Sequence, residues 1–198
     1  CHRAIVQSGA VFRQPTLDAA ESAGTTLADA MGCPDQSAEC LRALAVDDVL
    51  GGQPSGLQTT SPVIDGVVLP IPIRDALETG QFNRVPVMQG SNHDEMRLFV
   101  AAGFDLQGRP VTPETYDAAV AGLLGLPLGV VPIMTNHYPL ANYASPDLAV
   151  AALATDVGFA CNALASDEWL ARYVPVYAYE FDDADAPQLF LPPVSFPY

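Results

Sequence analysis

Short apolar runs of strand length alternate along the chain with longer stretches in which apolar residues recur at helical spacing. The strand candidates are Ala4 to Val6, Val85 to Gly90 and Val174 to Phe181. Because long helical patterns separate these runs, they cannot pair as hairpins and are expected to be parallel strands joined by helical crossovers. The pattern predicts an α/β fold in which the three strands lie adjacent, in chain order.

The helical stretches are placed by their spacing and by the residues at their ends. Apolar residues recur at helical spacing from 18 to 31, and Gly32 and Pro34 end that helix. The longest helix begins at Ser145-Pro146-Asp147, which supplies a capping hydroxyl, a proline at the first position and a carboxylate at the positive end of the dipole. Further helices are expected over residues 40–50, 70–77, 114–124 and 146–172, with a loop over 51–61.

The composition is that of a globular domain, and we expect one domain over residues 1–198. Hydrophobic residues make up 49% of the 198 residues and charged residues 16%. Three strands are few for a parallel sheet, which needs both faces covered. The chain also begins at the entrance to a strand and ends at Tyr198, directly after a proline-rich run. We therefore expect an incomplete domain whose remainder lies in sequence outside this chain.

The charge excludes two classes of partner. The formal net charge is −15, and all eight basic residues are arginine. Such an acidic chain has no electrostatic reason to bind nucleic acid or an anionic membrane surface. No uninterrupted run of 18 apolar residues is present, so no membrane-spanning helix is expected.

Glu95 is the candidate for chemistry. It follows the second strand candidate, and in α/β proteins the carboxyl ends of parallel strands hold the functional groups. A carboxylate there can hold a histidine in one tautomer and stabilise its imidazolium form. From the residues alone the alternative stays open that Glu95 is a surface acid beside Asp94.

Four segments, in this order, resemble the type B carboxylesterases, the family that also contains the cholinesterases and neuroligins. They are His2–Gly9, Ser61–Gly66 with Leu69-Pro70, Phe82–Glu95, and Thr155–Cys161 with Pro175–Phe181. Together they span essentially the whole chain, and Phe82–Glu95 is the most specific. The resemblance implies an α/β-hydrolase fold, of which this chain is the later part of the parallel sheet plus the helical cap.

The resemblance also implies roles for individual residues. Glu95 would be the acid of a catalytic triad, although Met96 stands where the family commonly has glycine. Ser8, by itself a turn residue, would support the acid by hydrogen bonding. Leu98 and Phe99, by themselves core residues, would line the substrate pocket. The family's Gly-x-Ser-x-Gly elbow is absent from this sequence, and its catalytic histidine would follow shortly after Tyr198.

The cysteines bear on the compartment. Cys33 and Cys40 close a short loop between two predicted helices, and the family often has a disulfide there. A bridge would indicate an oxidising compartment and hence secretion, whereas two reduced thiols would fit a cytosolic enzyme. Cys161 lies on an apolar helix, where we expect a buried thiol or one paired outside this chain. No His or Cys spacing matches a metal site.

The function expected from the resemblance is that of part of a serine carboxylesterase. The complete enzyme would hydrolyse a small-molecule carboxylic ester through an acyl-serine intermediate, without metal or organic cofactor. This chain would supply the triad acid and would be inactive alone. The alternative is a non-catalytic, cholinesterase-like adhesion or binding protein, which would have no chemical need for Glu95.

Overall fold

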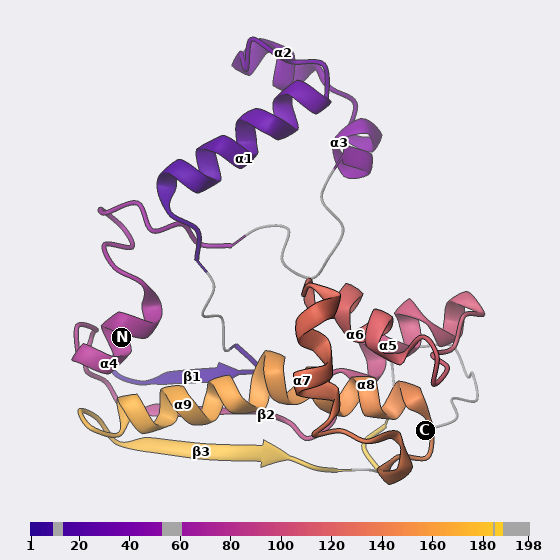
Figure 1. Cartoon of the computed structure of the whole chain (residues 1–198). Coiled ribbons are helices and arrows are strands. Elements are labelled where there is room, and N and C mark those ends of the chain that lie inside the picture. Colours follow the sequence, from indigo (N-terminus) through magenta and orange to yellow (C-terminus); the bar gives the residue numbers. More distant parts are fainter. Residues whose placement is uncertain (10–13, 53–60, 184, 188–198) are drawn as a thin grey trace. The chain divides into compact units, whose positions relative to one another are not determined.

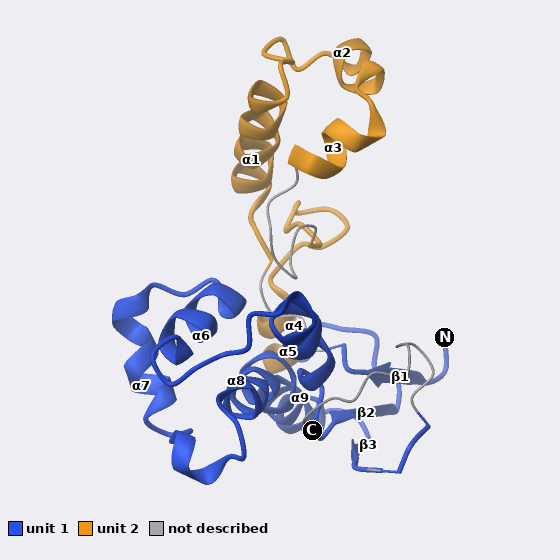
Figure 2. Cartoon of the chain, turned by 90° about the vertical axis from the view of Figure 1, so that its right-hand side faces the viewer, with its two compact units in different colours: residues 1–10, 80–198 blue, residues 11–79 orange. Residues whose placement is uncertain are grey.

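The computed structural model describes residues 1–9, 14–52, 61–183 and 185–187. The chain divides into two compact units, one formed by residues 1–10 and 80–198 and the other by residues 11–79 (Figure 2). Each unit is described separately below. The division does not test whether residues 1–198 belong to a single domain, so that expectation stays a prediction.

The first unit contains a three-stranded parallel sheet. Its strands are β1 (Ala4–Gln7), β2 (Val87–Asn92) and β3 (Val176–Phe181), in the order β1-β2-β3. The predicted parallel order is confirmed. Strand β2 begins later than the apolar run because Pro86 has no N–H to donate, and its carbonyl instead accepts from the Ala4 N–H at 3.0 Å.

Helices of the first unit lie beside the sheet and along one of its faces (Figure 1). They are α5 (Arg97–Gly103), α6 (Tyr116–Leu124), α7 (Val131–Thr135), α8 (Pro146–Thr155) and α9 (Cys161–Leu170), with 3₁₀ turns η1 (Asp105–Gln107), η2 (Leu128–Val130) and η3 (Leu140–Asn142). A π-helical turn, η4 (Asp156–Ala160), joins α8 to α9. The helix predicted over 146–172 is therefore present, but with a wide turn in its middle that its apolar spacing did not indicate.

Helix α9 runs along the sheet (Figure 1). The buried side chain of Gln89, on β2, makes hydrogen bonds to this helix. The Gln89 amide nitrogen lies 3.2 Å from the Ala163 carbonyl oxygen, 2.5 Å from the Ser166 hydroxyl and 3.0 Å from the Asp167 carboxylate. Burial raises the pKa of Asp167, and the hydrogen bond from Gln89 acts in the opposite direction. These contacts fix the position of the central strand against the helix.

The hydrophobic core of the first unit lies among helices α5, α6, α7 and α8. Val100, Val131, Val150 and Leu153 have no exposed surface there. Helix α8 contributes five residues to this core, Ala149, Val150, Ala151, Leu153 and Ala154. The start of α8 is capped as the sequence predicts: the Ser145 hydroxyl accepts from the Leu148 N–H at 3.3 Å.

The sheet face opposite α9 presents an apolar row. Ile5, Met88 and Tyr177 are in register across the three strands, and their side chains are 64%, 41% and 64% exposed. Further along this face Gly90 lies against Tyr179, where an added Cβ would come within 2.6 Å of the tyrosine ring. A side chain at position 90 would therefore force the two strands or the ring apart.

The second unit contains α1 (Leu17–Ala30), α2 (Ala38–Ala43), α3 (Val46–Gly52) and α4 (Ile73–Thr79). The single helix predicted over 40–50 is wrong: extended backbone at Leu44, with ψ 140°, separates α2 from α3. The loop predicted over 51–61 begins inside α3, and residues 53–60 lie outside the described residues.

The predicted disulfide between Cys33 and Cys40 is present and joins the end of α1 to α2. The Cα atoms are 5.8 Å apart, and Cys33 is fully buried. Cys161, in contrast, is a free and exposed thiol, so the expectation of burial is wrong. It begins α9 directly after the π-helical turn, whose extra residue changes the helix face that the following side chains occupy.

Within the part of the chain that the structure describes, the helical stretch Pro146–Leu170 is long and apolar enough to cross a membrane by length and composition. Its α8 half forms the centre of the hydrophobic core described above, and core helices of soluble proteins pass the same test. The stretch is therefore weak evidence for a membrane span, and the absence of a membrane partner stays a prediction.

Candidate functional site

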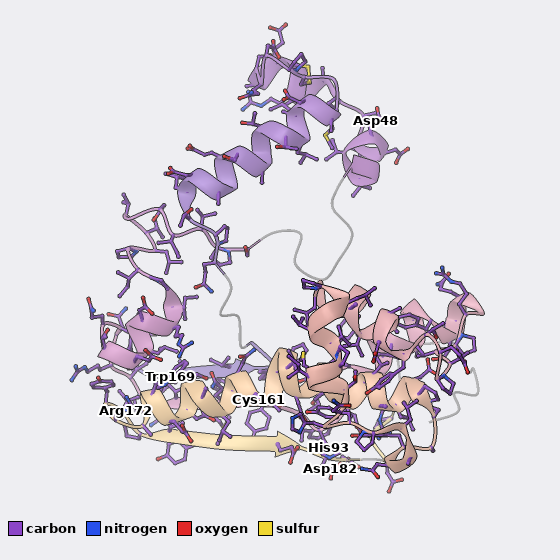
Figure 3. The ribbon with its side chains drawn as sticks, in the orientation of Figure 1. Asp48, His93, Cys161, Trp169, Arg172 and Asp182 are labelled. Atoms are coloured by element: carbon purple, nitrogen blue, oxygen red, sulfur yellow. A yellow bond between two sulfur atoms is a disulfide. The ribbon has the colours of Figure 1, made fainter. Side chains whose placement is uncertain are left out.

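The candidate site lies where β2 ends and the chain turns into α5. Glu95 is in this turn, which we call the acid loop and define as residues 92–96. The backbone N–H of His93 donates to the Phe181 carbonyl at 3.0 Å, which holds the acid loop against the end of β3. Figure 3 shows His93 and Asp182 at this carboxyl edge of the sheet.

Both oxygens of the Glu95 carboxylate accept hydrogen bonds. Oε1 accepts from the Ser8 hydroxyl and from the Asn92 backbone N–H, the latter at 2.8 Å. Oε2 accepts from the Asn92 side-chain amide at 3.0 Å. These donors hold the partly buried carboxylate in one orientation and leave lone pairs on Oε2 for a further donor.

Ser8 and Glu95 meet although 87 residues separate them in the sequence. Strands β1 and β2 are parallel neighbours, so their carboxyl ends lie at the same edge of the sheet. The Ser8 N–H continues the ladder to the Gly90 carbonyl at 2.9 Å, and Ser8 itself has a φ of 53°. A left-handed serine is uncommon, and such conformations cluster at functional sites.

The neighbouring charges in the acid loop are arranged differently from Glu95. The Asp94 carboxylate faces outward and pairs with Arg97 at 2.9 Å and with the His93 ring at 3.3 Å. Because the His93 ring nitrogen is directed at Asp94, the loop pairs its own histidine with the exposed acid. Glu95 is thereby left facing the Ser8 side of the sheet edge.

Leu98 and Phe99 follow the acid loop in the first turn of α5. Their side chains are 45% and 42% exposed, so the interpretation of both as core residues is wrong. They form an apolar surface close in sequence to Glu95, whereas Val100 on the same helix enters the core.

Two residues that hold Glu95 or the peptide after it were not identified from the sequence. Asn92 binds Glu95 through two groups, and its position three residues before an acid at a strand end was the available signal. Thr155 accepts a hydrogen bond from the backbone N–H of Met96 at 3.1 Å. It lies 59 residues away at the end of α8, and no local pattern indicates such a contact.

Among the residues that the structure describes, no group of three His, Cys, Asp or Glu could hold a metal ion. The chemistry available at the acid loop is that of an oriented carboxylate. Such a group can accept a hydrogen bond from an imidazole N–H and favour the protonated form of that ring.

Comparison with known proteins gives one consistent result. The profile of the Carboxylesterase family matches residues 1–196. Liver carboxylesterase 1F of Rattus norvegicus is 27% identical over 209 residues, which cover 91% of this chain and 37% of that protein. Para-nitrobenzyl esterase of Bacillus subtilis is 26% identical over 190 residues, covering 91% of this chain and 36% of that protein.

A solved structure of PNB esterase has a related fold. It superposes with a TM-score of 0.64 at 24% identity and covers 94% of this chain and 38% of its own length. At that identity the likeness concerns the fold alone, and it confirms the predicted α/β-hydrolase fold. The chain spans little more than a third of each of these three proteins.

Proposed function

Because this chain belongs to the carboxylesterase family, we propose that it is the acid-carrying part of a serine carboxylesterase. In this proposal Glu95 accepts the N–H of a histidine supplied by another part of the complete protein. The histidine takes the proton of a nucleophilic serine, whose oxygen attacks the ester carbonyl carbon. The alcohol leaves with that proton, and water then releases the acid from the acyl-serine.

One observation carries the proposal: the Glu95 carboxylate is held by three hydrogen bonds at the carboxyl end of a central parallel strand. A solvated surface acid does not need donors from two strands. A triad acid does, because it must present one oxygen to the imidazole in a fixed direction. Ser8 and Asn92 are accordingly proposed to position Glu95.

The serine, the histidine and the oxyanion hole are proposed to come from the remainder of the same hydrolase domain. Two facts support this. The chain spans 37% and 36% of the length of the two curated esterases described above. The sheet face opposite α9 also exposes the apolar row Ile5, Met88 and Tyr177, which a complete α/β domain would cover.

The proposed substrate is a small-molecule carboxylic ester, and the proposed reaction needs no metal or organic cofactor. Leu98 and Phe99 are proposed to form part of the substrate pocket. Their half-exposed side chains beside the acid loop offer an apolar surface that is suited to an acyl or alcohol group. Nucleic acids and anionic membranes are not expected partners, given the net charge of −15.

Secretion is proposed from the disulfide. The Cys33–Cys40 bridge joins two helices of the second unit, and bridges of this structural kind persist in oxidising compartments.

Labelling by a fluorophosphonate probe tests the proposed function. We expect the full-length protein to hydrolyse p-nitrophenyl acetate and to bind one equivalent of the probe. The 198-residue chain alone should do neither, because a lone carboxylate supplies no nucleophile and no proton transfer. A full-length protein that is folded but inert to both reagents would favour the adhesion or binding protein. Labelling of the short chain would place the nucleophile within it.

A further inference from the structure

The backbone on the far side of Glu95 is fixed by a helix that comes from a distant part of the sequence. The Met96 N–H donates to the Thr155 hydroxyl oxygen at 3.1 Å. Both side chains are buried, with exposed fractions of 2% for Met96 and 3% for Thr155. A buried N–H without a partner is costly, so this contact holds the peptide that directly follows Glu95.

Thr155 acts on α5 as a cap supplied by another helix. Met96 is the N-cap residue of α5, and no side chain of the acid loop caps this helix. The Met96 carbonyl accepts from the Val100 N–H at 2.9 Å, so the same residue bonds forward into α5 and sideways to α8. The start of α5, and with it the direction in which Glu95 leaves the backbone, depends on the position of Thr155.

Thr155 directly precedes the π-helical turn, and several hydrogen bonds hold this turn on both sides. Asp156 accepts from the Tyr138 hydroxyl at 2.5 Å, and the Tyr138 carbonyl accepts from the Tyr116 hydroxyl at 3.0 Å. Burial raises the pKa of Tyr138, and the hydrogen bond to Asp156 raises it further, so the phenol stays a donor at neutral pH. On the other side of the turn the Asn162 amide donates to the Val157 and Gly158 carbonyls at 3.1 and 3.3 Å.

We propose that Thr155 is a positioning residue for the triad acid: through the Met96 N–H it fixes the backbone from which Glu95 reaches the catalytic histidine. This inference rests on the function proposed above. Ser8 and Asn92 hold the carboxylate group itself, and Thr155 holds the backbone directly after Glu95. The Glu95 side chain is therefore constrained both at its carboxylate and at its backbone end.

The test compares T155V with T155S in the full-length protein, with T135V as a matched control. Valine keeps the shape of threonine and removes the acceptor, whereas serine keeps the hydroxyl. Thr135 is also buried, and its hydroxyl donates to Asp117 at 3.0 Å, away from the acid loop. T135V should lower thermal stability and leave kcat unchanged. We expect T155V to lower kcat by roughly 10- to 100-fold with little change in KM, since small misplacements of a catalytic group cost up to about 10²-fold.

A second readout separates positioning from stability. The acidic limb of the kcat/KM profile reports the pKa of the catalytic histidine. A misplaced carboxylate stabilises the imidazolium less, so in T155V this limb should move to lower pH, and T155S should restore it. The titratable groups beside Glu95 in the acid loop and at the start of α5 are His93, Asp94 and Arg97, and none of them is altered in these variants.

Glu95→Gln, measured in parallel, distinguishes the two proposals. If E95Q loses activity while T155V keeps the kcat and the acidic limb of the wild type, Thr155 is no positioning residue, and the proposed function stands. If E95Q keeps normal kcat, the proposed function itself is wrong. An equal fall in kcat for T155V and T135V, with the acidic limb of the pH profile unchanged, would also overturn the inference.

If T155V does not fold, hydrogen exchange of the wild-type Met96 amide tests the inference instead. Protection equal to that of the α8 core supports the contact with Thr155, and exchange as fast as that of a loop contradicts it.

Discussion

At the scale of single residues, the acid loop shows how the fold creates a directed carboxylate. Asp94 and Glu95 are neighbouring acids, yet Asp94 pairs with the exposed Arg97, whereas Glu95 accepts from Ser8, directly after β1, and from Asn92 at the end of β2. The difference arises because Glu95 faces Ser8 across the sheet edge.

Ser8 should therefore matter for rate more than for stability. In the full-length protein we expect S8A to lower kcat by roughly tenfold with KM little changed, because a hydrogen bond to a charged group contributes about 1.5–3 kcal/mol. Steady-state kinetics would measure this, with S22A on the exposed surface of α1 as the control. Equal kinetics for S8A and S22A would mean that Asn92 alone orients the carboxylate.

The sequence allowed some of these residues to be predicted and not others. Glu95 and Ser8 belong to segments with a recognisable family pattern, so their roles could be proposed before their contact was known. Asn92 and Thr155 carry no such pattern. Their contacts depend on a turn geometry and on a helix 59 residues away, which periodicity does not encode.

At the scale of elements, the three strands were predictable because a short apolar run between helical stretches has few alternatives. Their parallel order followed from the crossovers. The break between α2 and α3 was not predictable, because one extended residue at Leu44 interrupts an otherwise suitable helical pattern. The π-helical turn was missed for a similar reason, since its one extra residue leaves the overall apolar spacing almost unchanged.

Helix α8 should contribute strongly to the stability of the first unit. Leu153 is fully buried, so we expect L153A to lower the free energy of unfolding by about 2–5 kcal/mol, the usual cost of a large-to-small core substitution. L164A, on the same helical stretch but 63% exposed, should change it by less than about 0.5 kcal/mol. Urea denaturation of both variants measures the difference. Similar values would show that α8 is not packed as described, as would be expected of a membrane-embedded helix.

The disulfide should stabilise the second unit to a limited extent. It closes a short loop, with a sequence separation of 7, so its removal should cost at most about 2.5 kcal/mol by the chain-entropy estimate. The measurement is the denaturation midpoint of the C33S/C40S double variant in oxidising buffer. No loss of stability, or free thiols at both positions in a non-reducing peptide map, would remove the basis for proposing secretion.

At the scale of the whole molecule, the chain has an α/β-hydrolase fold and belongs to the carboxylesterase family. Its fold places the Glu95 carboxylate at the carboxyl edge of the sheet, and its family match extends over residues 1–196. The division into two compact units was not predicted, because composition and spacing do not report how densely segments contact one another. The fold class was predictable, since it depends on strand order and on segments distributed along the entire sequence.

The central claim is that Glu95 is the acid of a catalytic triad, and the kcat of E95Q in the full-length protein tests it most directly. The matched control is D94N, which removes the adjacent charge and its pairing with Arg97. We predict that E95Q lowers kcat by about 10³- to 10⁴-fold, as loss of the acid does in the serine-protease triad, and that D94N stays within about twofold of the wild type. Near-normal kcat for E95Q, or an equal loss in D94N, would contradict the account.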